Sequence, residues 1–173
     1  MRVLVLALGN PILGDDGVAF HVMHALRPRL SEGPDLVLDE AMAGGIELLT
    51  HIVGFDRVLI LDAVKTPGAT PGQVRAFKEG DFEETLHASS PHSTNFATAM
   101  AMGRAMHPDE MPSEVAIVGV EVERVYEFNE GLTPAVEAAV PVAAEEAARV
   151  LRAWGVQVGR PPRRKPRGSL RDR

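Results

Sequence analysis

The fold is decided by the stretch Arg2-Val-Leu-Val-Leu-Ala-Leu8 and by the turn residues Gly9-Asn10-Pro11 that follow it. A continuous apolar run of this length, ended by turn formers, is typical of a strand buried on both faces of a parallel sheet. Five apolar residues then share one face of a predicted helix: Val18, Ala19, Val22, Met23 and Leu26. Pro28 helps to end that helix. A strand that leads into a helix is the opening of a βα unit.

The same alternation of strand and helix continues along the chain. The sequence predicts strands near 36–38, at 57–62, around 74–77 and at 115–120, and helices at about 46–53, 90–106 and 134–154. Ser90-Pro91 and Thr133-Pro134 are favourable starts for the last two helices. This α/β pattern predicts a twisted, largely parallel sheet with helices on both faces, and we expect the 74–77 strand to be antiparallel at an edge.

Length and charge predict one domain followed by a tail. A chain of 173 residues with 45% hydrophobic content is long enough for one substantial core, so we expect a single α/β domain at 1–156. Residues 157–173 hold seven of the 18 basic residues and one of the 24 acidic ones, which leaves the domain with a net charge of −12. Three prolines and few apolar residues predict that 157–173 is disordered. A solvated extension is a more common role for such a tail than contact with an acidic partner.

Composition also excludes several classes of protein and site. The acidic domain argues against a nucleic-acid partner. The apolar run from Met1 to Leu8 is too short for a signal peptide, and no stretch reaches the roughly 18 apolar residues of a membrane span, so we expect a soluble, cytoplasmic protein. The sequence contains no cysteine, which excludes disulfides, thiolate metal sites and a cysteine nucleophile.

Three candidate functional residues follow predicted strands or begin a helix. Asp16 lies in the loop after the first strand, and Asp62 ends the 57–62 strand. His92 lies at the start of the 90–106 helix, where the helix dipole favours the neutral imidazole that binds metal. In a parallel sheet such residues meet outside the carboxyl ends of the strands. Two carboxylates and one imidazole suit a divalent first-row ion, with nickel preferred over iron or manganese and zinc also possible.

Each of these residues also has a purely structural interpretation. Asp15 is predicted to cap the helix that follows it, and Asp16 alone could do the same. Asp62 alone could brace its loop, and a single histidine such as His92 is more often a structural hydrogen-bonding group than a ligand. Their predicted convergence on one edge of the sheet is what favours a site.

Other motifs support function less well. The loop at 9–17 lacks the glycine patterns of dinucleotide and phosphate sites, and the serines near His92, at 89, 90 and 93, lack the elbow motif of serine hydrolases. Met100, Met102 and Met106 are predicted to fill the core rather than to bind a soft metal. Surface or core roles are expected for the other histidines: His21, His24, His51, His87 and His107.

The stretch Leu4-Val-Leu-Ala-Leu-Gly9-Asn10-Pro-Ile-Leu-Gly-Asp15-Asp16-Gly17-Val18 closely resembles the signature loop of hydrogenase maturation proteases. Four later segments resemble the family's in the same order: Ile46-Glu47-Leu48-Leu49, Leu59-Ile-Leu-Asp62-Ala63, Ser90-Pro91-His92 and Gly131-Leu132-Thr133-Pro134-Ala135-Val136. Together they span roughly residues 2–150. This ordered set is much more specific than the opening loop alone.

The resemblance implies a three-layer sandwich around a sheet of about five strands, and places the family's metal-contacting positions on Asp16, Asp62 and His92. It also implies an endopeptidase that removes the C-terminal extension of a nickel-iron hydrogenase large-subunit precursor after nickel insertion, with the precursor presenting the nickel. The chain departs from the family at Glu40-Ala41-Met42-Ala43-Gly44-Gly45, where an expected threonine is missing. That segment is linked to substrate choice in the family, so the departure bears on which hydrogenase is processed.

Two alternative functions are kept. The first is a non-catalytic nickel checkpoint that binds the same precursor without cutting it. The second is a general metal-dependent hydrolase that carries a divalent metal of its own. Mass measurement of the precursor and metal analysis of the free protein distinguish these alternatives from the endopeptidase.

Overall fold

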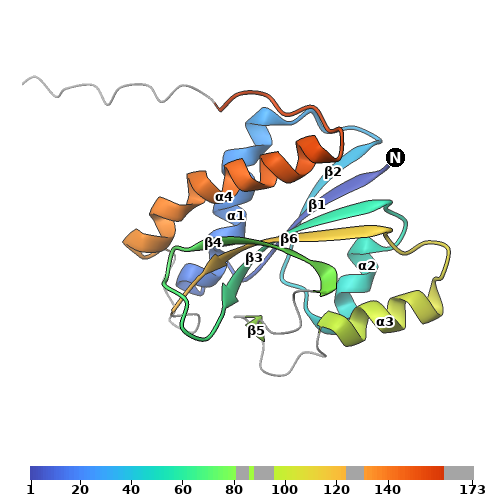
Figure 1. Ribbon diagram of the computed structural model, residues 1–173, viewed down its shortest axis with the longest axis horizontal. Coiled ribbons are helices and arrows are strands. Elements are labelled where there is room, and N and C mark those ends of the chain that lie inside the picture. Colours follow the sequence, from blue (N-terminus) through green and yellow to red (C-terminus); the bar gives the residue numbers. More distant parts are fainter. Residues whose placement is uncertain (81–85, 88–95, 124–130, 162–173) are drawn as a thin grey trace, which may run out of the picture.

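The computed structural model describes residues 1–80, 86–87, 96–123 and 131–161. The predicted strands and helices are present in the predicted order (Figure 1). The strands are β1 (Val3–Leu8), β2 (Leu36–Ala41), β3 (Arg57–Lys65), β4 (Val74–Lys78), β5 (Leu86–His87) and β6 (Glu114–Glu121). The α-helices are α1 (Val18–Leu26), α2 (Leu49–Ile52), α3 (Phe96–Met106) and α4 (Pro134–Ala153), and the 3₁₀ helices are η1 (Gly14–Gly17), η2 (Arg27–Arg29) and η3 (Gly45–Leu48).

The strands form one mixed sheet in the order β2-β1-β3-β6-β4. The pairs β1–β2, β1–β3 and β3–β6 are parallel, whereas β4 pairs antiparallel with β6 at the edge, as the sequence predicts. The short strand β5, which was not predicted, pairs with Val64 and Lys65 of β3, beyond the last β3 residue that pairs with β1. The parallel strands β1, β2, β3 and β6 therefore all end at one edge of the sheet.

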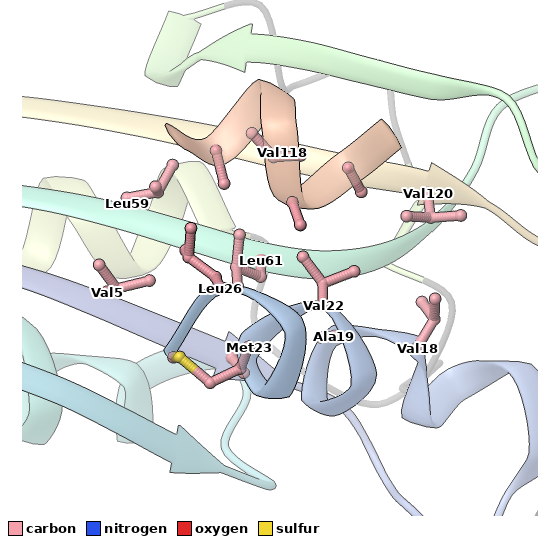
Figure 2. Close-up of a cluster of buried hydrophobic side chains, with 14 of the residues drawn as sticks. Val5, Val18, Ala19, Val22, Met23, Leu26, Leu59, Leu61, Val118 and Val120 are labelled. Carbon is pink, nitrogen blue, oxygen red and sulfur yellow. The ribbon is translucent and has the colours of Figure 1, made fainter. Parts of the chain in front are cut away.

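Helices cover both faces of this sheet, so the predicted three-layer α/β sandwich is confirmed (Figure 1). Alternate residues of β1 and β3 point to opposite faces, because successive side chains of a strand alternate. Leu59 and Leu61 pack with α1 and α4 in one core cluster, while Val58 and Ile60 pack with α2 and α3 in the other. Figure 2 shows the first cluster, with the apolar face of α1 against β1, β3 and β6.

Several element boundaries differ from the predicted ones. The helix expected over 46–53 is the 3₁₀ helix η3 followed by the single turn α2, and the helix expected from residue 16 begins as η1. The strand expected near 36–38 extends to Ala41. The predicted first turn of the 90–106 helix falls partly on 90–95, which lie outside the described residues.

The chain continues past α4 as an irregular segment on the surface of the domain. Val156 and Val158 pack against the first core cluster, and the amide of Gly159 donates to the Arg29 carbonyl at 2.8 Å. The buried Arg29 side chain in turn donates from Nε to the Gly159 carbonyl at 3.1 Å. Residues 162–173, most of the predicted disordered tail, lie outside the described part, so that prediction stands untested. Within the described ranges, no helix is long and apolar enough to cross a membrane.

Candidate functional site

Asp16 and Asp62 reach the same edge of the sheet from two neighbouring strands. β1 pairs with β3 as far as Ala7↔Leu61, so Asp62 lies just past the last paired residue. Asp62 lies two residues from both Ile60 and Val64 in β3, so the three side chains share one face of the sheet. Ile60 and Val64 pack on the α2–α3 side, and Asp62 therefore points toward that side as well. Asp16 is carried by η1, the 3₁₀ turn that follows β1.

The carboxylate of Asp16 is buried beside that of Asp62. Asp16 has no exposed surface and Asp62 is only 3% exposed. One oxygen of Asp16, Oδ2, accepts the backbone N–H of Asn10 at 2.8 Å, but the other, Oδ1, is buried with no hydrogen-bond partner. Burial raises the pKa of Asp16 to about 7, with a further contribution from the negative charge of Asp62, and the Asn10 hydrogen bond only partly offsets this.

Two buried carboxylates at close range favour a bound proton or a bound cation. When both are ionised, Asp16 is desolvated and repelled by Asp62, and the Asn10 hydrogen bond offsets this only in part, so a proton on Asp16 is one way to relieve it. A divalent cation is another, because carboxylate oxygens are good ligands for such ions and Asp16 Oδ1 is without a partner. The residues present therefore fit a divalent metal ion.

The third predicted ligand, His92, lies outside the described residues, so a shared site for Asp16, Asp62 and His92 stays a prediction. No three His, Asp or Glu side chains come together as a metal-ligand set within the ranges that the structure covers. That result does not bear on a trio that includes His92. The three serines near His92, at positions 89, 90 and 93, also lie outside the described residues.

The prediction that Asp15 caps the following helix is wrong. Neither η1 nor α1 has a side-chain cap. Instead, Asp15 Oδ1 accepts the backbone N–H of Thr133 at 2.7 Å, and Oδ2 accepts the Thr133 hydroxyl at 2.9 Å. Thr133 is the residue that precedes α4, so Asp15 joins the turn after β1 to the start of the last helix. Sequence reasoning treated Thr133 only as a helix start and missed this contact.

A fourth buried carboxylate, Glu121, was also missed. It ends β6 at the same edge of the sheet and is 2% exposed. Its Oε2 accepts the backbone N–H of Thr66 at 2.9 Å, and its Oε1 lies 3.7 Å from the guanidinium of Arg75. The register Val64↔Glu121 places its side chain on the same face as Asp62. Its position at the end of a predicted central strand is the signal that could have identified it.

The remaining candidates separate into buried and surface residues. Met100 fills the core as predicted, but the prediction is wrong for Met102 and Met106, which are 38% and 62% exposed. His51 pairs with Asp39 at 2.8 Å, in agreement with a structural role. His21 and His24 are exposed on α1.

The segment that departs from the family pattern lies next to the Asp16 turn. β2 ends at Ala41, whose carbonyl accepts the N–H of Gly9 at 3.3 Å, and Met42 is 73% exposed. Glu40, the acid retained in this segment, lies two residues after Leu38 in β2 and so points to the same face, the α1 side. There its carboxylate lies 3.5 Å from the guanidinium of Arg27. Glu40 thus faces away from the side on which Asp62 lies.

Comparison with known proteins gives one consistent family. The model of the family described as hydrogenase maturation protease matches residues 20–150. The hydrogenase 2 maturation protease of Escherichia coli is 33% identical over 160 residues, which covers 91% of this chain and 94% of that protein. The hydrogenase expression/formation protein HoxM of Cupriavidus necator is 28% identical over 88% of this chain and 75% of its own length.

Solved structures give the same result. The hydrogenase maturating endopeptidase HybD from E. coli superimposes with a TM-score of 0.78 at 30% identity, over 94% of this chain and 98% of that chain. A [NiFe] hydrogenase maturation protease HybD from Thermococcus kodakarensis has a TM-score of 0.63 at 24% identity and supports the fold alone.

Proposed function

Because this chain belongs to the hydrogenase maturation protease family, a family of peptidases, we propose that it removes the C-terminal extension of a nickel-iron hydrogenase large-subunit precursor after nickel insertion. The family membership supports an endopeptidase that acts in hydrogenase maturation. The identity of the bond that is cut and the need for nickel are part of the proposal. We also propose that the protein acts in the cytoplasm and that it binds neither nucleic acid nor a membrane.

The observation that carries the proposal is the buried pair of Asp16 and Asp62. Asp16 has an unpartnered oxygen and a pKa raised to about 7 by burial and by Asp62. Such a pair offers two negative charges to a cation, and Asp16 Oδ1 is free to bind it. It is therefore suited to capture a cation that arrives with the substrate.

In the proposed complex, Asp16, Asp62 and His92 hold the nickel that the precursor presents. A nickel ion held there polarises the scissile carbonyl and lowers the pKa of a bound water, each worth several kcal/mol of barrier. Asp16 gives up its proton on binding, and the amide of Asn10 keeps the carboxylate in place through the 2.8 Å hydrogen bond to Oδ2. The main role of these residues is thus to orient the nickel-bearing segment of the precursor.

This arrangement also explains selectivity for a loaded precursor. A precursor without nickel brings no positive charge to the Asp16–Asp62 pair, which then stays protonated or mutually repelled. The complex with an empty precursor is accordingly weaker. Selection by charge compensation needs no large recognition surface, which agrees with the small size of the chain.

The test is an incubation of the purified chain with nickel-loaded and nickel-free precursor, followed by mass spectrometry of the precursor. We expect loss of the C-terminal extension from the loaded precursor only. Asp16→Ala, Asp62→Ala and His92→Ala should each abolish processing, while Asp35→Ala, at a carboxylate that is 83% exposed, serves as a matched control. Normal processing by any of the three site variants would show that the residue assignment is wrong.

A non-catalytic checkpoint is the second candidate, favoured by the segment at 40–45, where the expected threonine is missing beside the Asp16 turn. A checkpoint would bind the loaded precursor and leave its mass unchanged. A hydrolase that carries its own ion would instead be purified with stoichiometric metal and would cleave unrelated peptides. The same incubation, together with metal analysis of the free protein, separates all three functions.

A further inference from the structure

Asp15 and Asp16 are consecutive residues of η1, but their side chains have different environments. Asp16 is directed toward Asn10 and Asp62. The side chain of Asp15, which is 2% exposed, accepts two hydrogen bonds from Thr133, 118 positions further along the chain. The two carboxylates of this short turn therefore connect the ligand pair on one side with the beginning of α4 on the other.

The Thr133 hydroxyl is diverted from its usual role in order to make this contact. A threonine before a helix normally uses its hydroxyl oxygen to accept an N–H of the first helical turn. Thr133 makes no such cap, and its hydroxyl donates to Asp15 Oδ2 instead. Its backbone N–H, which lies outside the helical ladder, donates to Oδ1. The hydroxyl and the backbone N–H of Thr133 thus both donate to the same carboxylate, that of Asp15.

The other hydrogen bonds of the turn that carries Asp16 are local. η1 is a four-residue 3₁₀ helix that begins with Gly14 and ends with Gly17, and it has no side-chain cap. A 3₁₀ turn has poorer hydrogen-bond geometry than an α-helix. The Asn10 N–H donates to Asp16 Oδ2, the Asp16 N–H donates to the Leu13 carbonyl, and the Val18 N–H donates to the Asp15 carbonyl. Each of these hydrogen bonds joins residues at most six positions apart. The hydrogen bonds that Asp15 accepts from Thr133, in contrast, join this turn to a distant element, the start of α4.

α4 is a firm anchor for this purpose. The helix has 20 residues, and its buried face, beginning at Val136, packs against α1 and the sheet. The two hydrogen bonds from Thr133 to Asp15 therefore tie η1 to a well-packed helix.

We propose that Asp15 is a positioning residue that, through Thr133, clamps the η1 turn to α4 and so holds Asp16 in place to bind and orient the substrate. This inference rests on the proposed function. Asp15 does not touch the substrate, and it contributes through the placement of its neighbour. Misplacement of a group at a reacting centre by about 1 Å can lower the rate by about 100-fold, so loss of the clamp should affect turnover.

Four variants test the clamp. Asp15→Ala removes both hydrogen bonds, and Thr133→Val keeps the shape and the backbone N–H of residue 133 but removes the hydroxyl. Asp15→Asn is the conservative variant, because its amide oxygen still accepts the Thr133 N–H and its NH₂ group can donate to the hydroxyl oxygen. The double variant Asp15→Ala/Thr133→Val shows whether the two residues act through one contact. Thr50→Val, which removes an exposed hydroxyl that donates to the Glu47 carbonyl, is the matched control.

The measurements are kcat and KM for a nickel-loaded precursor, the melting temperature, and hydrogen exchange at the Asp16 amide. We expect Asp15→Ala to lower kcat by about 10-fold to 100-fold while the protein remains folded at the assay temperature. Thr133→Val should lower it less, Asp15→Asn should restore it to near the wild-type value, and the double variant should be no worse than Asp15→Ala. Exchange at Asp16 should be faster in Asp15→Ala.

Other results overturn the clamp. It is wrong if folded Asp15→Ala keeps the wild-type kcat and the wild-type exchange rate at Asp16, or if Asp15→Asn is as impaired as Asp15→Ala. An additive double variant would equally reject a single shared contact. If wild-type protein fails to cut the precursor, the proposed function is what fails, and the exchange rates of Asp15→Ala and Asp15→Asn then decide the clamp by themselves.

Discussion

The backbone carbonyl of Asp16 lies against the α-carbon of Gly9, so closely that a β-carbon on Gly9 would stand 2.2 Å from the carbonyl oxygen. Gly9 also has a φ of 147°, which residues with a side chain rarely adopt. After β1 the chain therefore turns back, so that the Asp16 backbone packs on Gly9, the first residue after the strand. This close approach determines where η1 and Asp16 lie.

The first prediction concerns this contact. Gly9→Ala should destabilise the protein by about 2 kcal/mol or more, because the new methyl group collides with backbone that cannot move without displacing the turn. Urea unfolding measures the change. Gly33→Ala is the matched control, since a β-carbon there would meet nothing within 4 Å. Equal stability of the two variants would contradict the role given to Gly9.

The second prediction is a pH dependence of stability that arises from Asp16. Its pKa is about 7 in the folded protein against an ordinary value of 3.8, so between these values the folded state keeps a proton that the unfolded state has lost. Stability from this group therefore falls as pH rises from about 4 to about 7, by a few kcal/mol in total. Asp16→Asn should remove this fall and make the protein more stable than wild type at pH 8.

Urea unfolding of both proteins from about pH 5 to about pH 8 measures the effect, and the difference between the two curves isolates Asp16 from the histidines. Asp35→Asn, at an exposed carboxylate, should leave the wild-type curve unchanged. Parallel curves for wild type and Asp16→Asn would show that Asp16 is not protonated near neutral pH.

The third prediction separates the two causes of the Asp16 shift. Asp62→Asn removes the neighbouring negative charge but leaves the burial of Asp16 in place. Because burial is the larger cause, the pKa of Asp16 should fall below about 7 and yet remain above 3.8. NMR titration of the Asp16 carboxyl carbon measures it. An unchanged pKa would mean that the two carboxylates do not interact.

The nearness of Asp16 and Asp62 could be predicted because it depends on general rules. Parallel strands end at a common edge, so a residue just past β1 and one near the C-terminal end of β3 lie close together there. The partner of Asp15 could not be predicted, since it depends on where α4 begins relative to η1 after the whole domain has folded. For the same reason the sequence did not show which side of α3 is covered, and Met102 and Met106 were misplaced in the core.

The short elements at 45–52 were also beyond sequence reasoning. Gly45 has a positive φ of 57°, and the pattern of apolar residues after it did not distinguish a 3₁₀ turn followed by one α-helical turn from a continuous helix. Local periodicity is similar for both over so few residues. The role of Asp16, Asp62 and His92 as ligands remains a prediction that only the processing experiments test.

The last prediction is that processing of the loaded precursor weakens in acid. Below about pH 7, Asp16 carries a proton that must leave before the carboxylate can bind a cation, so proton and nickel compete for the same oxygens. The value of kcat/KM should therefore decline below this pH by about tenfold per pH unit. Rates from about pH 5.5 to about pH 8 at limiting precursor measure the profile, and nickel-free precursor, which should stay uncut throughout, controls for acid cleavage. A flat profile between pH 6 and pH 8 would mean that Asp16 binds no cation during the reaction.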